Sequence, residues 1–439
     1  MALDTDISLR GKLLYSVYVR SHSPSGDFAG VLADLDRIRD LGVDIVWFLP
    51  IHPSGVAGRK GEAGSPYAIR DYRAVDPAYG TREEFERLVD AIHDRGMLAM
   101  MDVVFNHTSP DSVLWETHPE WFYRDADGTP ANRNPDWADI IDLDLDVRDG
   151  LWDYHVETLR GWARIVDGFR CDVAPLLPME FWSRARREVA EVKEGVVWLA
   201  ETVEPEFVRL LRSRGLLCHS DGETYQAFDL TYDYDVINGL RDYALGTGTL
   251  ADYVRLLELQ DSWYPDNYVK LRFLENHDRD RVASFATSPE DLLVWTAFLY
   301  FQKGATLLYA GQEHQDPNRP SLFDVDPVAW DPGKDLSDHL RRLREVTRDP
   351  IVVDGAYRLR VAPGVDTVVG SYTREAGAGS VSGTRSLVGI FPFRSEEADV
   401  AVPELPDGEH VDLVSGGVLT VRDGIVHSTG RAAIVSVAQ

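Results

Sequence analysis

The sequence predicts an α/β fold: a closed (β/α)8 barrel with a short insertion after the third strand and a C-terminal antiparallel β-sandwich domain. Over the first 350 residues, short apolar or β-branched runs alternate with amphipathic stretches, which is typical of βαβ units. Eight such runs fit a closed barrel better than an open sheet. After residue 350 the pattern changes to short alternating runs separated by Gly-rich turns, which indicates antiparallel strands.

The predicted barrel strands cover residues 13–17, 45–49, 98–104, 168–172, 196–199, 227–230, 271–274 and 306–309. Two of the helices between them are expected at 83–95 and 181–192. In the first, Phe85, Leu88 and Ile92 recur at helical spacing, so they form one apolar face. The expected C-terminal strands cover residues 357–361, 367–372, 386–391, 425–427 and 432–437.

These elements divide the chain into a (β/α)8 barrel over residues 1–350 and a β domain over 351–439. The insertion covers residues 106–147. A loop after a barrel strand usually has about 2–6 residues, so a loop of this length is more often functional than idle. It is rich in aromatic residues: Trp115, Trp121, Phe122, Tyr123 and Trp137.

The chain of 439 residues carries a formal net charge of −28, which opposes binding to nucleic acid or to anionic membranes and suits a neutral partner such as a sugar. Among the basic residues, arginine greatly outnumbers lysine. A GC-rich genome and adaptation to a salty cytoplasm both explain this composition, and the sequence leaves the two explanations open.

Cysteine content and hydropathy bear on the location of the protein. The two cysteines, Cys171 and Cys218, make a disulfide framework improbable and suit a reducing compartment. No apolar stretch reaches the ~18 residues that a membrane span needs, and the N-terminal residues lack a signal-peptide pattern. We therefore expect a cytoplasmic protein without a membrane partner, whose oligomeric state the sequence does not indicate.

Acidic and basic residues gather at the ends of the predicted strands, where (β/α)8 barrels place catalytic groups. Four strand ends carry them: Asp102 with Asn106 and His107, Arg170 with Asp172, Glu201, and His277 with Asp278. We therefore expect the carboxyl groups of Asp172, Glu201 and Asp278 to converge on one mouth of the barrel.

Cleavage of a glycosidic bond with retention requires this combination of groups. One carboxylate acts as the nucleophile and one carboxylic acid protonates the leaving oxygen. Arg170 precedes Asp172 by two residues, so both side chains point to the same side of a strand. A neighbouring cation lowers the pKa of a carboxyl group, whereas burial helps the acid to keep its proton.

The motifs at these strand ends resemble those of the α-amylase superfamily, glycoside hydrolase family thirteen. The resemblance covers essentially the whole chain and includes DVVFNH (102–107), GFRCDV (168–173), LAET (199–202) and FLENHD (273–278). Supporting segments are GVDIVWFLPI (42–51), SPYAIRDY (65–72) and GATLLYAGQE (304–313).

The resemblance implies a role for each matching residue. Asp172 would be the nucleophile and Glu201 the general acid/base, with a covalent glycosyl-enzyme intermediate. Asp278 would bind sugar hydroxyls and help to distort the ring. The remaining matches would orient the nucleophile (Arg170), hydrogen-bond the sugar (His107, His277), stack on it (Tyr67) and support the site (Asp102).

Many relatives hold calcium between the barrel and the insertion, although no cofactor is required for this chemistry. Asn106 and Asp142 match two of the usual ligand positions, and the carbonyl of Leu176 could serve as another oxygen ligand. The Lys-His pair that often follows the nucleophile is absent, because the chain reads VAPL (173–176) after Asp172. The missing lysine also weakens the expectation of binding to long polymers on the leaving-group side.

The expected activity is hydrolysis of α-1,4 bonds in maltooligosaccharides and starch-type glucans, by an α-amylase-like member without an N-terminal domain. An α-1,6-glucosidase or a 4-α-glucanotransferase remains the alternative on the same scaffold. Val173 favours α-1,6 cleavage, whereas the segment IIDLDLD (140–146) does not match the usual α-1,6 pattern. A non-catalytic relative would need a broken catalytic set, and this set is intact.

Overall fold

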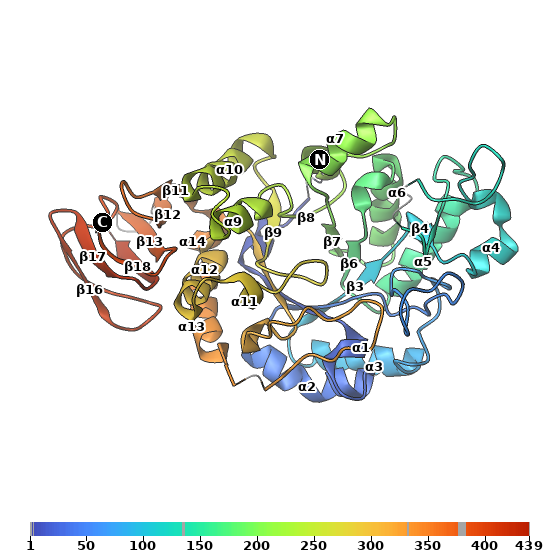
Figure 1. Ribbon diagram of the computed structural model, residues 1–439, viewed down its shortest axis with the longest axis horizontal. Helices are drawn as coiled ribbons and strands as arrows, with labels where there is room; N and C mark the ends of the chain where they lie inside the picture. Colours follow the sequence, from blue (N-terminus) through green and yellow to red (C-terminus); the bar gives the residue numbers. More distant parts are fainter. Residues whose placement is uncertain (1, 3, 134–136, 332, 376–382, 439) are drawn as a thin grey trace. The chain divides into compact units, whose positions relative to one another are not determined.

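The computed structural model describes residues 2, 4–133, 137–331, 333–375 and 383–438 (Figure 1). Eight parallel strands form a closed barrel in the order β1-β10-β9-β8-β7-β6-β3-β2, which confirms the predicted fold class. The barrel strands are β1 Leu13–Val17, β2 Ile45–Phe48, β3 Leu98–Val103, β6 Gly168–Cys171, β7 Val197–Ala200, β8 Leu230–Tyr232, β9 Val269–Arg272 and β10 Ala305–Tyr309.

Most of these strands lie within one or two residues of their predicted positions. The largest shifts are in β8, which was expected at 227–230, and in β9, which was expected at 271–274. In β8 the apolar run of Ala227 and Phe228 comes before the strand, because the pairing with β7 starts only at Leu230. Hydropathy shows where an apolar run lies in the sequence, whereas hydrogen bonding to the neighbouring strand decides at which residues the strand begins and ends.

Helices accompany the strands along the chain: α1 Val19–His22, α2 Phe28–Asp40, α3 Arg82–His93, α5 Leu151–Ala163, α6 Met179–Ala190, α7 Pro205–Ser213, α8 Asp221–Thr224, α9 Ile237–Ala244, α10 Leu250–Trp263, α11 Val282–Phe285, α12 Pro289–Phe301, α13 Ser337–Thr347 and α14 Ile351–Asp354. The two helices predicted in detail are α3 and α6. In α3 the side chain of Thr81 accepts a hydrogen bond from the backbone of Glu84, and Glu84 reciprocates, so a capping box starts the helix.

The insertion after β3 has little regular structure of its own. It contains β4 His107–Thr108, α4 Val113–Thr117 and β5 Ile141–Asp142. Strands β4 and β5 pair with each other and place His107 opposite Asp142. Residues 134–136 of the predicted insertion lie outside the described residues. The pairing fixes the two ends of the insertion against one another at the base of the loop.

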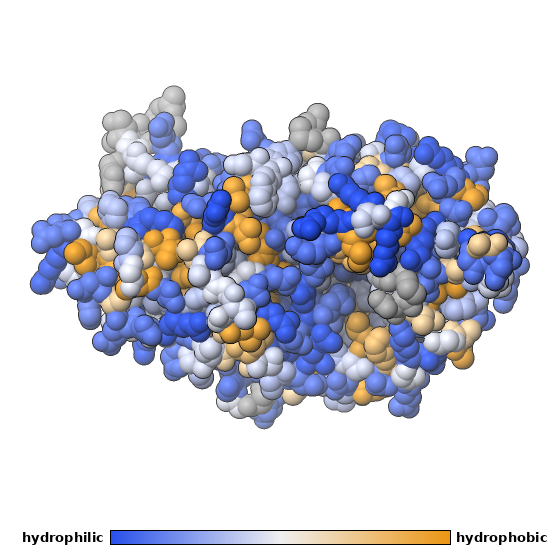
Figure 2. All heavy atoms as spheres, turned by 45° about the horizontal axis from the view of Figure 1, so that its top comes forward, coloured by the Kyte–Doolittle hydropathy of each residue, from blue (hydrophilic) through white to orange (hydrophobic). Residues whose placement is uncertain are grey.

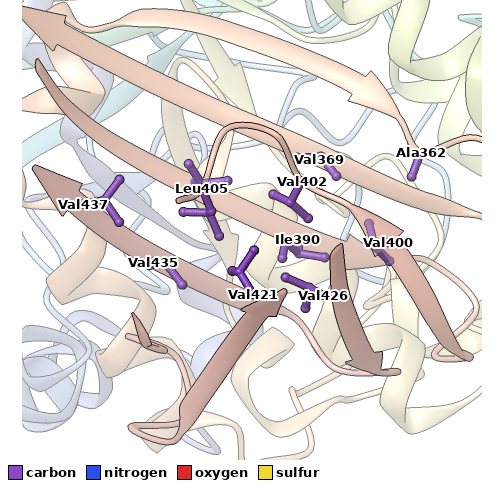
Figure 3. Close-up of a cluster of buried hydrophobic side chains, with 11 residues drawn as sticks. Ala362, Val369, Ile390, Val400, Val402, Leu405, Val421, Val426, Val435 and Val437 are labelled. Carbon is purple, nitrogen blue, oxygen red and sulfur yellow. The ribbon is translucent and has the colours of Figure 1, made fainter. Parts of the chain in front are cut away.

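The C-terminal residues form two antiparallel sheets, as predicted. One has the order β11-β12-β13-β18 and the other β14-β17-β16-β15. Their strands are β11 Ala356–Val361, β12 Thr367–Glu375, β13 Thr384–Pro392, β14 Glu397–Ala401, β15 Gly408–Val411, β16 Val418–Arg422, β17 Ile425–Thr429 and β18 Ala433–Ala438. Valine, isoleucine and leucine side chains from both sheets, among them Ile390 and Val426, form the core between them (Figure 3).

Three of these strands, β14, β15 and β16, were not predicted. Each is four or five residues long, and most of its side chains are partly or fully exposed. With at most one fully buried position per strand, the alternation of apolar and polar residues is too weak to recognise.

A pair of glycines lets the first sheet approach helix α12. Gly370 and Gly389 face each other in the register of β12 and β13. A Cβ atom on Gly370 would lie 2.6 Å from the ring of Phe301, and one on Gly389 would lie 3.1 Å from it. The absent side chains therefore make room for Phe301, which also packs on Tyr372 and Phe391.

The chain divides into two compact units that are interleaved along the sequence. The first comprises Met1–Thr5, Leu14–Tyr232 and Arg319–Ala329; the second comprises Asp6–Leu13, Asp233–Asn318 and Trp330–Gln439. The boundary at residue 350 therefore stays a prediction. Hydrophilic side chains cover most of the face shown in Figure 2. Among the described residues, each helix is too short or too polar to cross a bilayer.

The buried histidine of α5 makes stability depend on pH. His155 is fully buried against the rings of Phe105 and Tyr72, and neither ring nitrogen has a hydrogen-bond partner among the described residues. Burial lowers the pKa of His155 from 6.5 to about 3. Between these two pH values His155 is protonated in the unfolded chain but neutral in the folded protein. The free energy of unfolding therefore falls as the pH falls from 6.5 towards 3.

Replacing His155→Phe should therefore increase the free energy of unfolding, and the gain should grow by about 1.4 kcal/mol for each pH unit below 6.5. Urea denaturation at pH 7.5, 6 and 5 measures this gain. The control is the wild-type protein, measured at the same three pH values, whose stability sets the baseline for the gain. A gain for His155→Phe that is the same at all three pH values would contradict the prediction.

Candidate active site

Three adjacent barrel strands bring the predicted catalytic residues together. The register of β3 and β6 places Asp102 beside Arg170, and that of β6 and β7 places Arg170 beside Leu199. The backbone N–H of Asp172 donates to the carbonyl of Val103, and that of Glu201 donates to the carbonyl of Cys171. Asp172 and Glu201 therefore stand just beyond the ends of neighbouring strands, as the sequence predicted.

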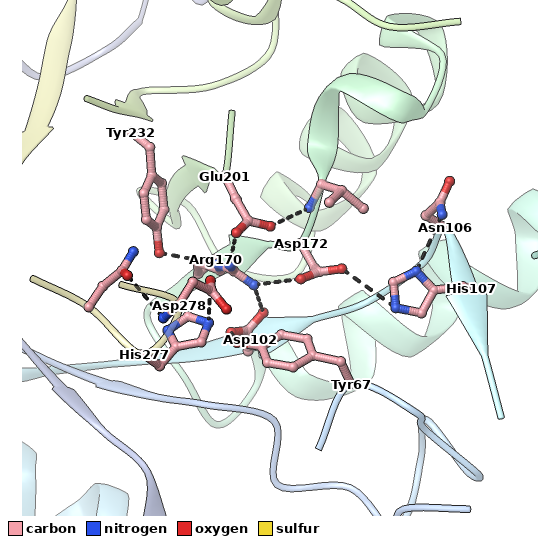
Figure 4. Close-up of polar contacts among 12 residues, drawn as sticks. Tyr67, Asp102, Asn106, His107, Arg170, Asp172, Glu201, Tyr232, His277 and Asp278 are labelled. Carbon is pink, nitrogen blue, oxygen red and sulfur yellow. Dashed lines mark hydrogen bonds and ion pairs between the residues drawn. The ribbon is translucent and has the colours of Figure 1, made fainter. Parts of the chain in front are cut away.

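The guanidinium of Arg170 contacts three carboxyl groups (Figure 4). Its Nη1 lies 2.8 Å from Asp102 and 2.9 Å from Asp172, and both contacts are hydrogen bonds. Its Nη2 lies 2.7 Å from Oε1 of Glu201, with which it forms an ion pair. Arg170 is completely buried. One cation thus links the predicted nucleophile, the predicted acid and the predicted support residue.

The backbone after the nucleophile also holds Glu201. The N–H of Val173 donates a hydrogen bond of 2.8 Å to Oε2 of Glu201. For this, Val173 adopts a left-handed conformation with φ of 36°, which is unfavourable for a β-branched residue. Such backbone strain clusters at functional sites, and here it aims an N–H at the predicted acid/base.

Aromatic rings surround the guanidinium of Arg170. The hydroxyl of Tyr67 donates to Asp102 at 3.1 Å, and the ring of Tyr67 lies 5.5 Å from the guanidinium carbon. Trp47 and Tyr232 lie at 5.5 and 5.6 Å from the same carbon. These two residues were missed by the sequence analysis. Tyr232 ends β8, so a correct position for that strand would have revealed it.

Burial changes the protonation of two groups beside the nucleophile. Burial lowers the pKa of His107 to about 4, against the opposing effect of Asp142. His107 is therefore neutral near pH 7, with its Nε2 3.8 Å from Oδ2 of Asp172. Burial raises the pKa of Asp102, although Arg170 opposes the shift. Burial thus shifts both His107 and Asp102 towards their neutral forms.

The remaining predicted residues follow β9 in the second compact unit. Nε2 of His277 lies 3.0 Å from Oδ2 of Asp278, and the backbone N–H of Asp278 donates to the side chain of Asn276. Asn276 in turn donates to the hydroxyl of Tyr234. This network orients His277 and Asp278 at the end of their strand. Their roles towards a substrate stay predictions.

The oxygen donors predicted for calcium lie together at one cavity. Asp142 and Asn106 line it with Leu176. Oδ2 of Asp142 accepts from the backbone of Arg133, whose guanidinium lies 3.5 Å away, whereas Oδ1 is buried without a hydrogen-bond partner among the described residues. Burial raises the pKa of Asp142. An incompletely compensated carboxylate next to an amide suits a hard cation, which would need further oxygens from carbonyls or water.

Within the described residues there is no group of three or more histidine, cysteine, aspartate or glutamate side chains that could hold a metal. Any calcium at Asn106 and Asp142 would therefore depend on amide and carbonyl oxygens for most of its ligands.

The cluster around Arg170 predicts a large and specific loss of stability on its disruption. Replacing Arg170→Leu leaves buried carboxyl groups without their cation, so the free energy of unfolding should fall by about 3–5 kcal/mol. Replacing Arg348→Leu, which removes an exposed pair with Glu345, should cost less than about 1 kcal/mol. Urea denaturation compares the two variants. Equal losses would mean that Arg170 does not hold the cluster.

The chain is similar over most of its length to proteins of known families. Residues 13–140 match the family described as alpha amylase, catalytic domain, and residues 358–435 match the bacterial alpha amylase C-terminal domain. The solved structure of an α-amylase from Lactobacillus plantarum is 43% identical, with a TM-score of 0.94, and the match covers 98% of this chain and 100% of that one. A noncanonic maltogenic α-amylase from Thermotoga neapolitana is 31% identical, with a TM-score of 0.85 and coverage of 98% and 100%.

Curated relatives are longer than this chain. Alpha-amylase MalA of Haloarcula japonica is 27% identical over 429 residues, which are 92% of this chain and 58% of the relative. The chain thus spans less than two thirds of the length of that relative. Because the 43% identity to the Lactobacillus plantarum enzyme extends over nearly the whole chain, the protein belongs to the α-amylase family, glycoside hydrolase family thirteen.

Proposed function

We propose that this protein is a retaining glycoside hydrolase that cleaves α-1,4-glucosidic bonds in maltooligosaccharides and starch-type glucans. The observation that carries the proposal is the contact of Asp172 and Glu201 with one buried guanidinium. In a retaining enzyme the nucleophile and the acid lie about 5–5.5 Å apart. Contact with neighbouring nitrogens of one side chain suits such a short separation.

The proposed reaction has two displacement steps. In the first, a carboxylate oxygen of Asp172 forms a bond to the anomeric carbon while the glycosidic C–O bond breaks, and Glu201 gives its proton to the leaving oxygen. In the second, Glu201 takes a proton from water, the water oxygen attacks the anomeric carbon, and the ester to Asp172 breaks. Arg170 favours the ionised form of Asp172 both before the substrate reacts and after the product has left.

The preference for α-1,4 bonds is supported by the relatives. The solved relatives at 43% and 31% identity are described as an α-amylase and a maltogenic α-amylase. Transfer of the glycosyl unit to a sugar acceptor and hydrolysis of α-1,6 bonds would use the same catalytic residues as hydrolysis of α-1,4 bonds. Analysis of the products must therefore distinguish the three activities. A cytoplasmic location and a lack of nucleic-acid or membrane partners stay predictions from composition.

Replacing Asp172→Asn or Glu201→Gln should abolish most activity and leave the fold intact. The first change removes the nucleophile and the second removes the general acid/base. Thin-layer chromatography on maltotriose, isomaltose and soluble starch measures the products, and circular dichroism checks the fold. Shorter products from maltotriose indicate hydrolysis, longer ones transfer, and glucose from isomaltose α-1,6 cleavage. Near-normal rates in either variant would refute the assigned roles.

The length of the glucan substrate should affect the catalytic efficiency, because the insertion is too short to form the wall of a long binding groove. Each subsite needs its own platform for a sugar ring, and the lysine of the leaving-group side is replaced here by the segment VAPL (173–176). We expect kcat/KM per productive site to be higher on maltotetraose than on soluble starch. The prediction fails if starch is the equal or better substrate.

Calcium should act on stability and should not be required for activity. Asn106 and Asp142 would hold it, and it would supply positive charge that compensates Asp142 and ties the insertion to the barrel. Added calcium should raise the melting temperature, and Asp142→Asn should remove this increase, while activity persists in EGTA. An unchanged melting temperature with millimolar calcium would refute binding, and activity lost in EGTA would refute the second part.

A further inference from the structure

The segment 275–282, which carries His277 and Asp278, is closed into a loop by one buried carboxylate. It follows β9 and ends at Val282, the first residue of α11. Nη1 of Arg281 donates a hydrogen bond of 2.7 Å to Oε1 of Glu275, and the backbone N–H of Val282 donates one of 2.8 Å to Oε2. Both oxygens at the start of the segment therefore bind groups at its end.

The guanidinium of Arg281 also ties this loop to β10, the neighbouring strand of the barrel. Its Nη2 donates to the carbonyl of Ala310, directly after β10, at 2.8 Å, and its Nε donates to the carbonyl of Asn318 at 3.1 Å. Glu275 and Arg281 are buried, with 1% and 0% of their surfaces exposed. All of these residues belong to the second compact unit. The loop is therefore anchored to a rigid part of the chain.

The ion pair between Glu275 and Arg281 suits a role in geometry better than a role in stability alone. Burying two charges removes them from water, and a well-packed apolar pair of similar volume is often equally stable. Burial raises the pKa of Glu275, and the charge of Arg281 opposes this rise. In a medium of low dielectric, a buried pair with its hydrogen bonds satisfied permits few alternative arrangements. Such a pair can fix one conformation of the loop.

Asp278 is the side chain that this loop leaves open to a ligand (Figure 4). Its side chain is 38% exposed, whereas that of His277 is 1% exposed. Its backbone N–H donates to the side chain of Asn276, and its Oδ2 lies 3.0 Å from Nε2 of His277. A carboxylate that is accessible but already held in place loses little freedom when it binds a ligand.

We propose that Glu275 and Arg281 are positioning residues that hold Asp278 in the orientation for binding sugar hydroxyls. Because both are buried, neither can contact a substrate, and they act through the backbone of the loop. Small displacements of a group that binds the reacting sugar cost much of the rate, since the transition state requires a defined geometry. The proposal rests on the proposed function and on the predicted role of Asp278 in it.

An exposed ion pair of the same loop offers a matched comparison. Nη2 of Arg241 on α9 lies 3.0 Å from Oδ2 of Asp280, and the two side chains are 46% and 48% exposed. Water screens such a pair, so its loss has little effect. Arg241→Gln replaces one charge of this pair by an amide, as Glu275→Gln does in the buried pair.

A double-mutant cycle tests the proposal. The substrate is α-maltosyl fluoride, because its good leaving group keeps the rates of weak variants measurable. Glu275→Gln should lower kcat/KM on the order of ten-fold in the otherwise unchanged protein. In the Asp278→Asn background the same change should lower kcat/KM less than about two-fold, because the carboxylate that it positions is already absent. Glu275→Asp, which keeps the charge, should recover much of the loss. Arg241→Gln should change kcat/KM less than about two-fold.

Melting temperatures and near-UV circular dichroism report the folding of every variant. Equal fold-losses from Glu275→Gln in both backgrounds would mean that it acts on the fold as a whole and would overturn the proposal. Normal activity of Glu275→Gln, or a Glu275→Asp variant that is equally slow, would also overturn it. If Glu275→Gln does not fold, Arg281→Lys takes its place in the cycle, since lysine keeps the charge but lacks the planar guanidinium. Wild-type protein inactive on α-maltosyl fluoride and on maltotriose would instead refute the proposed function.

Discussion

The guanidinium of Arg170 is the cation on which the catalytic arrangement depends. It is buried completely and contacts the carboxyl groups of Asp102, Asp172 and Glu201. Three carboxylates around one cation would leave excess negative charge in a medium of low dielectric, so protonation of at least one is favoured. Burial raises the pKa of Asp102, which shifts this carboxyl group towards its neutral form. Arg170 can thereby favour the ionised form of Asp172, the proposed nucleophile.

The barrel supplies this arrangement through strand register. Asp102, Arg170 and Glu201 come from β3, β6 and the residue after β7, which are neighbours in the barrel although they are far apart in the sequence. The strained backbone of Val173 adds a hydrogen bond to Glu201. Rigid strands position the carboxyl groups, while the loops that follow them form the surroundings, which is the usual division of roles in this fold.

The sequence predicted the positions of functional residues best where these residues belong to short contiguous motifs. The strand-end positions of Asp172 and Glu201 and the pairing of Arg170 with Asp172 follow from period-two alternation and from motif order. It failed for Trp47 and Tyr232, because neither carries a charge and their approach to Arg170 depends on how the strands pair. It also failed for β14, β15 and β16, whose side chains are mostly exposed and therefore lack a recognisable pattern.

The sequence by itself determined the fold class, the carboxyl pair Asp172 and Glu201, and the family, since local alternation and contiguous motifs contain that information. Tertiary structure alone decided which groups share the charge of Arg170, that His107 is neutral near pH 7, and that Trp137 meets Phe207. The physical reason is that charge sharing, burial and ring contacts depend on distances between segments that are remote in the chain, and strand register and loop packing set those distances only after folding.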